Sequence, residues 1–266
     1  MAYTLLAIPV NASSILLALI LGLVQGILEW IPVSSSAQVT ALALLAGADP
    51  AEAYELSLSL HLGTGLAALL AMRSELKRIV REDRGSAAKL LVPVALSFAV
   101  AAPIGLLFEE FLGLVGPAVL LALLGVLLLL TSAISRKSKA KRLKSEPTLA
   151  NVLVAGVGQG LSVLPGVSRS AITFSILLIA GVAEESALKW SYLLGIPAVI
   201  AAGLYGSLRT TASLPLVALG NAISLLAGLA SIEIMMRLVR AIKYDVITAI
   251  LGLLYIATAL FLGSLF

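Results

Sequence analysis

Six stretches of the chain are each apolar over about 20 residues, the length that a helix needs to cross the hydrocarbon core of a bilayer. They lie near residues 52–72, 87–107, 116–134, 186–207, 214–236 and 246–264. A segment in lipid must satisfy its own backbone polar groups, so each stretch can form a helix but not an open sheet. With 60% hydrophobic and 12% charged residues, the sequence predicts an all-α integral membrane protein with six transmembrane helices.

Two further apolar segments, near residues 12–47 and 150–181, are interrupted by residues that break helices. Pro32 interrupts the first segment, and Pro165 followed by Gly166 interrupts the second. Each segment is long enough for two short half-helices that meet at a polar turn, which membranes tolerate where protein buries the turn. We expect two re-entrant helical hairpins, although two full crossings in each segment would leave the remaining topology unchanged.

The basic residues predict how the chain is oriented. Lysine and arginine concentrate in three loops, with six at residues 73–89, six at 136–144 and three at 237–243. Six spans threaded through these loops put all three on one side, which the positive-inside rule assigns to the cytoplasm. We expect these loops to set the topology and attract anionic lipids rather than bind nucleic acid. The protein should therefore be a multi-pass protein of the cell membrane.

The chain contains an internal repeat with an offset of 134 residues. Over residues 22–70, 16 of 49 ungapped positions are identical to the residue 134 positions further on, which indicates duplication. Three spans separate the two hairpins, so the hairpins enter from opposite sides and form an inverted-topology repeat, as in many transporters. We expect a single membrane domain over residues 1–266, with repeats near 12–134 and 150–264 joined by a basic cytoplasmic loop at 135–149.

Polar residues gather where the first hairpin turns. The stretch over residues 25–40, QGILEWIPVSSSAQVT, holds the carboxylate of Glu29 in apolar surroundings. In the second copy the position of Glu29 is apolar, and that of Ser35 is Arg169. Ionisable groups inside a membrane need partners and mark functional sites by default. We expect Glu29, the serines at 34–36 and Arg169 to face one another in one pocket; alternatively, Arg169 only pairs with Glu29 as a structural bridge.

The surroundings of Arg169 suit a phosphate group. Ser168 and Ser170 flank the arginine, Thr173 lies one turn further on, and a Pro-Gly turn precedes the apolar helical run. Amides at a helix start, hydroxyls and a guanidinium fork together bind phosphate or pyrophosphate well.

At these residues the chain resembles a known family. The stretches QGILEWIPVSSS and LPGVSRSAITFS, with LHLGTGLAAL at 60–69 and KWSYLLGIPAVIAAG at 189–203, resemble the undecaprenyl-pyrophosphate phosphatase family of bacitracin-resistance proteins. The resemblance covers nearly the whole chain. It implies an integral membrane phosphatase that converts an undecaprenyl-type polyprenyl pyrophosphate into the monophosphate lipid carrier, with a divalent metal.

Carried over by position, the resemblance implies three catalytic residues. Glu29 would hold Mg²⁺ or Ca²⁺ against the pyrophosphate and serve as the base, and Ser35 would be the nucleophile or orient a water molecule. Arg169 would stabilise charge on the transferring phosphoryl group. The implied substrate-binding residues are Gln25, Ser34, Ser36, Gln38, Ser168, Ser170 and Thr173.

One departure from the family pattern concerns Gln38. The bacterial pattern usually has a histidine shortly after the serines, and an amide cannot act as a nucleophile or proton shuttle at neutral pH. The sole histidine, His61, belongs to another stretch, where a packing role and a role in the pocket are both open. The missing histidine leaves a second function open, a carrier that moves a polyprenyl phosphate or related anionic lipid across the bilayer. A homodimer is open as well.

Overall fold

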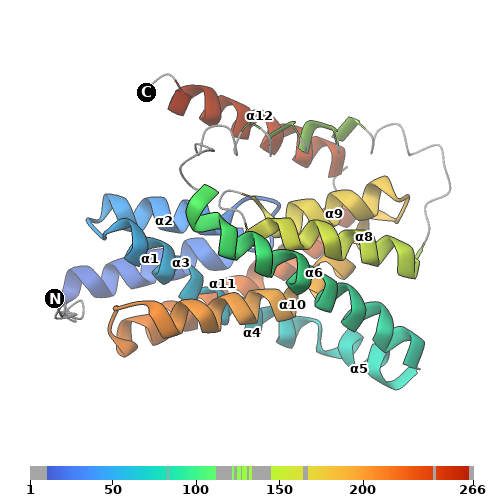
Figure 1. Ribbon diagram of the computed structural model, residues 1–266, viewed down its shortest axis with the longest axis horizontal. Helices are drawn as coiled ribbons and strands as arrows, with labels where there is room; N and C mark the ends of the chain where they lie inside the picture. The colour runs from blue at the N-terminus through green and yellow to red at the C-terminus, as the bar shows by residue number, and fades with distance from the viewer. Residues whose placement is uncertain are drawn as a thin grey trace. The chain divides into compact units, whose positions relative to one another are not determined.

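The computed structural model describes residues 11–82, 84–111, 145–163, 167–241 and 244–263, with scattered positions between 122 and 133. Every regular element in these residues is a helix, so the all-α prediction is confirmed (Figure 1). The helices are α1 (Ala12–Leu28), α2 (Ser35–Leu45), α3 (Pro50–Ser59), α4 (His61–Ala71), α5 (Arg73–Glu82), α6 (Arg84–Phe111), α8 (Leu149–Gly160), α9 (Arg169–Ile179), α10 (Glu184–Arg209), α11 (Leu214–Ala241) and α12 (Tyr244–Gly263).

Several of these helices have the length and composition of membrane spans. Three of the expected spans are long apolar helices, in α6 over Ala87–Ile104, in α10, and in α11 over Leu214–Val239. The shorter apolar helices include α1, α2, α9 and part of α12. The expected span near 116–134, most of the basic loop at 135–149 and the turn at Pro165-Gly166 lie outside the described residues. The described part of the chain is that of an all-helical membrane protein.

The stretch expected as one span near residues 52–72 is divided. It forms α3 and α4, which meet at Leu60, and together they bend by 62° into α5. The hydroxyls of Ser57 and Ser59 donate to the carbonyls of Tyr54 and Leu56, at 2.8 and 2.7 Å. Such side-chain bonds to the backbone bend helices, and hydropathy alone gives no sign of them.

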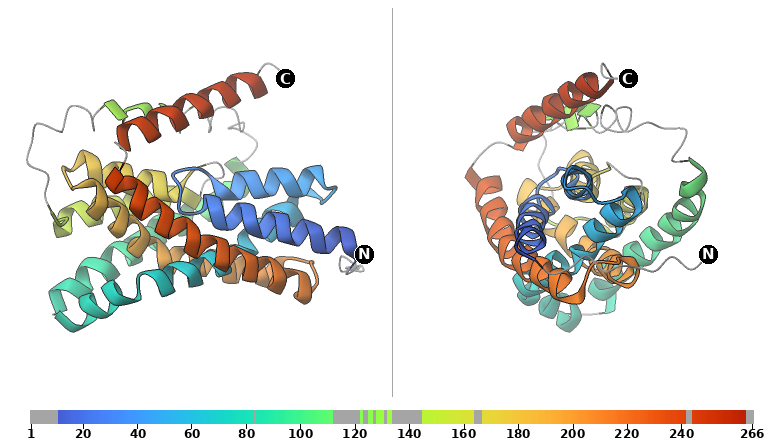
Figure 2. Two further views of the ribbon diagram at one scale, coloured as in Figure 1. Left: turned by 180° about the vertical axis from the view of Figure 1, so that it is seen from behind. Right: turned by 90° about the vertical axis from the view of Figure 1, so that its left-hand side faces the viewer.

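Both expected hairpins contain two short helices that lie side by side, α1 with α2 and α8 with α9 (Figure 2). A 3₁₀ turn, Leu161–Val163, follows α8. The second helices match in local structure, because α2 and α9 begin and end at positions 134 residues apart. Each is followed by a glycine in the left-handed region, Gly47 at φ +92° and Gly181 at φ +80°. The repeat read from the sequence is therefore present in local structure.

The chain divides into two compact units, and each takes helices from both halves of the sequence. The first unit comprises the residues up to Ile31, Ser35–Arg73 and Ile196–Glu233. The second comprises Pro32–Ser34, Ser74–Gly195 and the chain from Ile234 onward.

Small residues bring the helices of each unit into backbone contact. In the first unit, α1 lies so close to α11 that a Cβ at Gly22 would overlap the carbonyl oxygen of Gly220. In the second unit, α8 approaches α6 in the same way, and a Cβ at Gly156 would overlap the carbonyl oxygen of Pro93. Close approach of this kind is the usual basis of helix association in membranes, where no hydrophobic force acts between helices.

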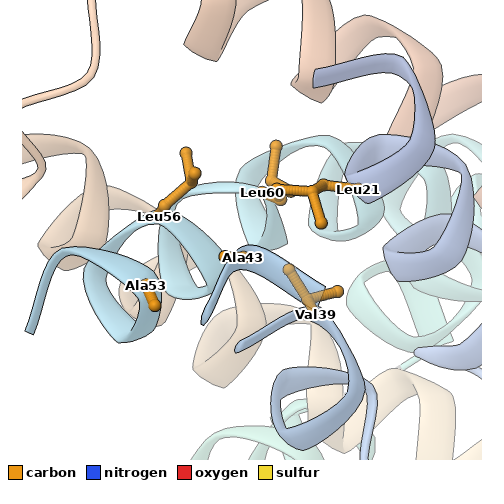
Figure 3. Packing of buried hydrophobic residues seen from close by; sticks show 6 residues of the cluster. All are labelled: Leu21, Val39, Ala43, Ala53, Leu56 and Leu60. Carbon is orange, nitrogen blue, oxygen red and sulfur yellow. The ribbon is translucent and has the colours of Figure 1, made fainter. Parts of the chain in front are cut away.

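Apolar side chains of α1, α2 and α3 form a core in the first unit (Figure 3). Val39, Ala43 and Ala53 are fully buried there, and the cluster also contains Leu21, Leu56 and Leu60. Small residues at the centre allow three short helices to pack closely. This core fixes the ends of α1 and α2.

Glu52 joins α3 to the segment that precedes α11. Its carboxylate is buried and accepts from the Thr210 hydroxyl at 2.6 Å and from the Ala212 N–H at 3.1 Å. The N–H and hydroxyl of Thr211 both donate to it at 2.8 Å. A buried carboxylate with this many donors fixes the loop between α10 and α11.

We predict that Glu52→Gln lowers the free energy of unfolding by about 2–3 kcal/mol, because an amide nitrogen would face backbone N–H groups and lose charge-assisted bonds. The matched control is Glu55→Gln on the same helix, which removes only the exposed pair with Arg209 at 3.0 Å. That change should cost at most about 1 kcal/mol. Thermal unfolding in detergent measures both variants, and equal losses would contradict the prediction.

Candidate active site

Glu29 lies at the end of α1, where the helix gives way to the turn before α2. Its N–H still donates to the carbonyl of Gln25 at 3.0 Å, so Gln25 lies one turn earlier on the same face. Both side chains are buried, with exposed fractions of 6% for Glu29 and 0% for Gln25. The Nε2 of Gln25 donates to Oε2 of Glu29 at 3.0 Å. A buried charge needs such partners, since an unpaired one is very unfavourable.

Ser35 supplies a second partner from the start of α2. Its Oγ donates to the same Oε2 of Glu29 at 2.6 Å. Hydrogen bonds of this length between a hydroxyl and a carboxylate are charge-assisted and strong. The structure therefore brings together Gln25, Glu29 and Ser35, and a carboxylate in this position can accept the proton of the hydroxyl.

His61, the first residue of α4, is the residue whose role the sequence left open. Its Nε2 lies 3.3 Å from Oε2 of Glu29, and its Nδ1 lies 2.9 Å from the carbonyl oxygen of Ser57. The side chain is buried. We call Gln25, Glu29, Ser35 and His61 the carboxylate cluster. The only sequence signal for the fourth member was that it is the sole histidine.

The other predicted residues of the first hairpin are placed differently. Ser34 is buried, and its N–H donates to the hydroxyl of Tyr255 at 2.5 Å within the second unit. Ser36 is half-buried. Gln38 is exposed on α2, so the amide at the position of the family's usual histidine is not part of the buried carboxylate cluster.

Arg169 begins α9 in the second unit. Ser168 caps this helix, because its Oγ accepts from the N–H of Ala171 at 3.3 Å. The guanidinium is buried and donates through Nη1 to the carbonyl of Ser191 at 3.1 Å. Gly195 leaves the space that the guanidinium occupies, since a Cβ there would overlap it.

Hydroxyl groups surround this arginine. Thr173 Oγ1 donates to the carbonyl of Arg169 at 2.9 Å and lies 2.5 Å from Ser191 Oγ. Ser168 Oγ and Ser170 Oγ lie 3.2 Å apart. We call these five residues the arginine cluster. Hydroxyls and a guanidinium at a helix N-terminus form an environment that favours an anion.

The two clusters use the same backbone position of the repeat. Ser57 and Ser191 are 134 residues apart, and their carbonyls hold the imidazole of His61 and the guanidinium of Arg169 respectively. His61 is itself repeat-related to Gly195. The identity of Ser57 with Ser191 was visible in the repeat alignment and was the signal that could have found both contacts.

The residues around Glu29 fit a metal that the substrate helps to hold. The Oε1 of Gln25 is buried and has no hydrogen-bond partner among the described residues, so it can act as a hard oxygen ligand beside Glu29. Within the same described residues, no group of three or more histidine, cysteine, aspartate or glutamate side chains could bind a metal ion. Mg²⁺ is often held by one or two carboxylates together with substrate phosphates, which is the arrangement these residues permit.

Comparisons with known proteins agree with this chemistry. The chain is 33% identical over 256 residues to undecaprenyl-diphosphatase of Haloarcula marismortui, covering 90% of this chain and 94% of the relative. It is 34% identical over 247 residues to undecaprenyl-diphosphatase of Methanothrix thermoacetophila, covering 90% and 95%. The profile of the family described as bacitracin resistance protein BacA matches residues 18–255. The chain therefore belongs to the BacA family of bacitracin resistance proteins.

Proposed function

We propose that the protein is a membrane phosphatase that hydrolyses an undecaprenyl-type polyprenyl pyrophosphate to the monophosphate lipid carrier. The observation that carries the proposal is the buried 2.6 Å hydrogen bond from Ser35 to Glu29, which pairs a nucleophile with a base. The names of the relatives support a diphosphatase and do not favour the carrier. The apolar helices of spanning length support a location in the cell membrane.

In the proposed reaction, Ser35 is the nucleophile. Its proton moves to Glu29 as Oγ forms a bond with the terminal phosphorus. The bond from that phosphorus to the bridging oxygen breaks, and the polyprenyl monophosphate leaves. Water then cleaves the phosphoserine, releases inorganic phosphate and restores the Ser35 hydroxyl. If Ser35 instead orients a water molecule, Glu29 accepts the proton of that water and phosphate forms in one step.

The arginine cluster would act on the same pyrophosphate. Arg169 neutralises charge on the phosphoryl oxygens, and Ser168, Ser170 and Thr173 bind the group by hydrogen bonds. A bound Mg²⁺ or Ca²⁺, held by Glu29 and Gln25, would neutralise further charge on the pyrophosphate. Ser34, Ser36 and Gln38 are proposed to contact the substrate near the turn.

The direct test is phosphate release by purified protein from farnesyl and undecaprenyl pyrophosphate, with Mg²⁺, with Ca²⁺ and with chelator. Turnover with a divalent metal is expected. Protein that binds polyprenyl phosphates but releases no phosphate under any of these conditions would exclude the phosphatase and favour the carrier.

We predict that Arg169→Ala lowers the rate about 100- to 1000-fold, or about 3–4 kcal/mol, because it removes a donor that stabilises transition-state charge. Arg169→Lys should recover only part of this, since a point charge cannot form the bidentate fork. The control is Gln38→Ala, which should change the rate little because the side chain is exposed. Steady-state kinetics measures all three, and a Gln38→Ala variant as inactive as Arg169→Ala would show that the catalytic residues are misassigned.

We also propose the finer architecture of six spans and two re-entrant hairpins related by an inverted repeat. The matching bounds of α2 and α9, with a left-handed glycine after each, support the duplication. The positions of the basic loops support opposite orientations of the two copies.

This topology predicts opposite accessibility for two repeat-related positions. Ala46 and Ala180 are 134 residues apart, the first exposed and the second half-exposed, and the chain has no native cysteine. In intact cells, a membrane-impermeant maleimide should label Ala46→Cys and should label Ala180→Cys only after permeabilisation. Labelling of both variants from the same side would rule out the inverted repeat.

A further inference from the structure

The contact between His61 and Glu29 has no part in the mechanism described so far. The imidazole comes from α4, whereas the other members of the carboxylate cluster come from α1 and α2. Its Nε2 lies 3.3 Å from the oxygen that also receives the hydroxyl of Ser35. The helix break at Leu60 places His61 at the start of α4, with its ring directed into this cluster.

The ring of His61 is held at both edges. A carbonyl oxygen can only accept, so Nδ1 must carry the hydrogen of its 2.9 Å contact with the carbonyl of Ser57. This contact fixes the rotation of the ring and directs Nε2 at Glu29. The side chain is 7% exposed, so water does not compete effectively for either edge.

Glu29 needs a partner that stays in place while Ser35 reacts. In the proposed reaction the Ser35 hydroxyl turns toward phosphorus and gives up its proton, so its bond to Oε2 changes during turnover. Gln25 remains, but its side chain has three rotatable bonds and lies on the same helix as Glu29. His61 is the stiff group from a separate helix.

We propose that His61 is a positioning residue that holds the Glu29 carboxylate in the orientation required to accept the proton of Ser35. The inference rests on the proposed phosphatase function. It assigns to His61 a part in the site that the exposed amide of Gln38 cannot take.

Two conservative variants separate this role from a purely structural one. In His61→Gln, the amide nitrogen can replace Nε2 and contact Glu29, but nothing replaces Nδ1. In His61→Asn, the amide nitrogen can replace Nδ1 and keep the contact with the Ser57 carbonyl, but it cannot reach Glu29. Positioning of Glu29 therefore favours Gln, whereas anchoring of the helix break favours Asn.

The test is steady-state phosphate release from undecaprenyl pyrophosphate by full-length variants in detergent, with thermal unfolding measured in parallel. His61→Asn and His61→Ala should lower kcat about 10- to 100-fold with KM nearly unchanged, as is typical when the partner of an active group is lost. His61→Gln should recover most of kcat. The control is Ser59→Ala, a fully buried hydroxyl at the same helix break that bonds only the carbonyl of Leu56, and it should retain wild-type kcat.

An Asn variant as active as the Gln variant would overturn the proposal, as would an Ala variant with wild-type kcat or a change confined to KM. If His61→Ala fails to fold, the comparison of Gln with Asn decides alone. Wild-type protein without any phosphate release would refute the phosphatase itself. An active wild type that is insensitive to all three substitutions would refute only the role of His61.

Discussion

The burial of one carboxylate sets much of the architecture around it. Glu29 lies in apolar surroundings, where a charge without partners would be too unfavourable to keep. Its partners come from the end of α1, the start of α2 and the start of α4. Since side chains at helix ends can converge on one point, the short helices end where the charge must be satisfied.

The second unit meets the same requirement for a charge of opposite sign. Arg169 receives its partners from the backbone and hydroxyls of α9 and α10, and Gly195 provides the space for its guanidinium. The carbonyls of Ser57 and Ser191 show that the duplicated scaffold kept one acceptor while the groups bound to it diverged. Duplication followed by divergence thus produced one cluster that can accept a proton and one that can bind an anion.

The sequence predicted the all-α class, three of the long apolar helices and the polar stretch that contains Gln25, Glu29 and Ser35. These depend on composition and on spacing within one segment, which the sequence shows directly. The division at Leu60 and the contact of His61 with Glu29 were not predicted. They depend on serine hydroxyls that bond to the backbone and on packing between distant segments, and hydropathy reports neither. The shared pocket for Glu29 and Arg169 stays a prediction.

The exchange of helices between the two halves has a consequence for biosynthesis. Gly22 on α1 packs against the carbonyl of Gly220 on α11, which the ribosome makes nearly at the end of the chain. The first hairpin, with its carboxylate, therefore enters the membrane long before its packing partner exists. Until α11 is inserted, the translocation machinery or other helices must shield that hairpin from lipid. Neither half of the chain contains all the surfaces that it needs to mature alone.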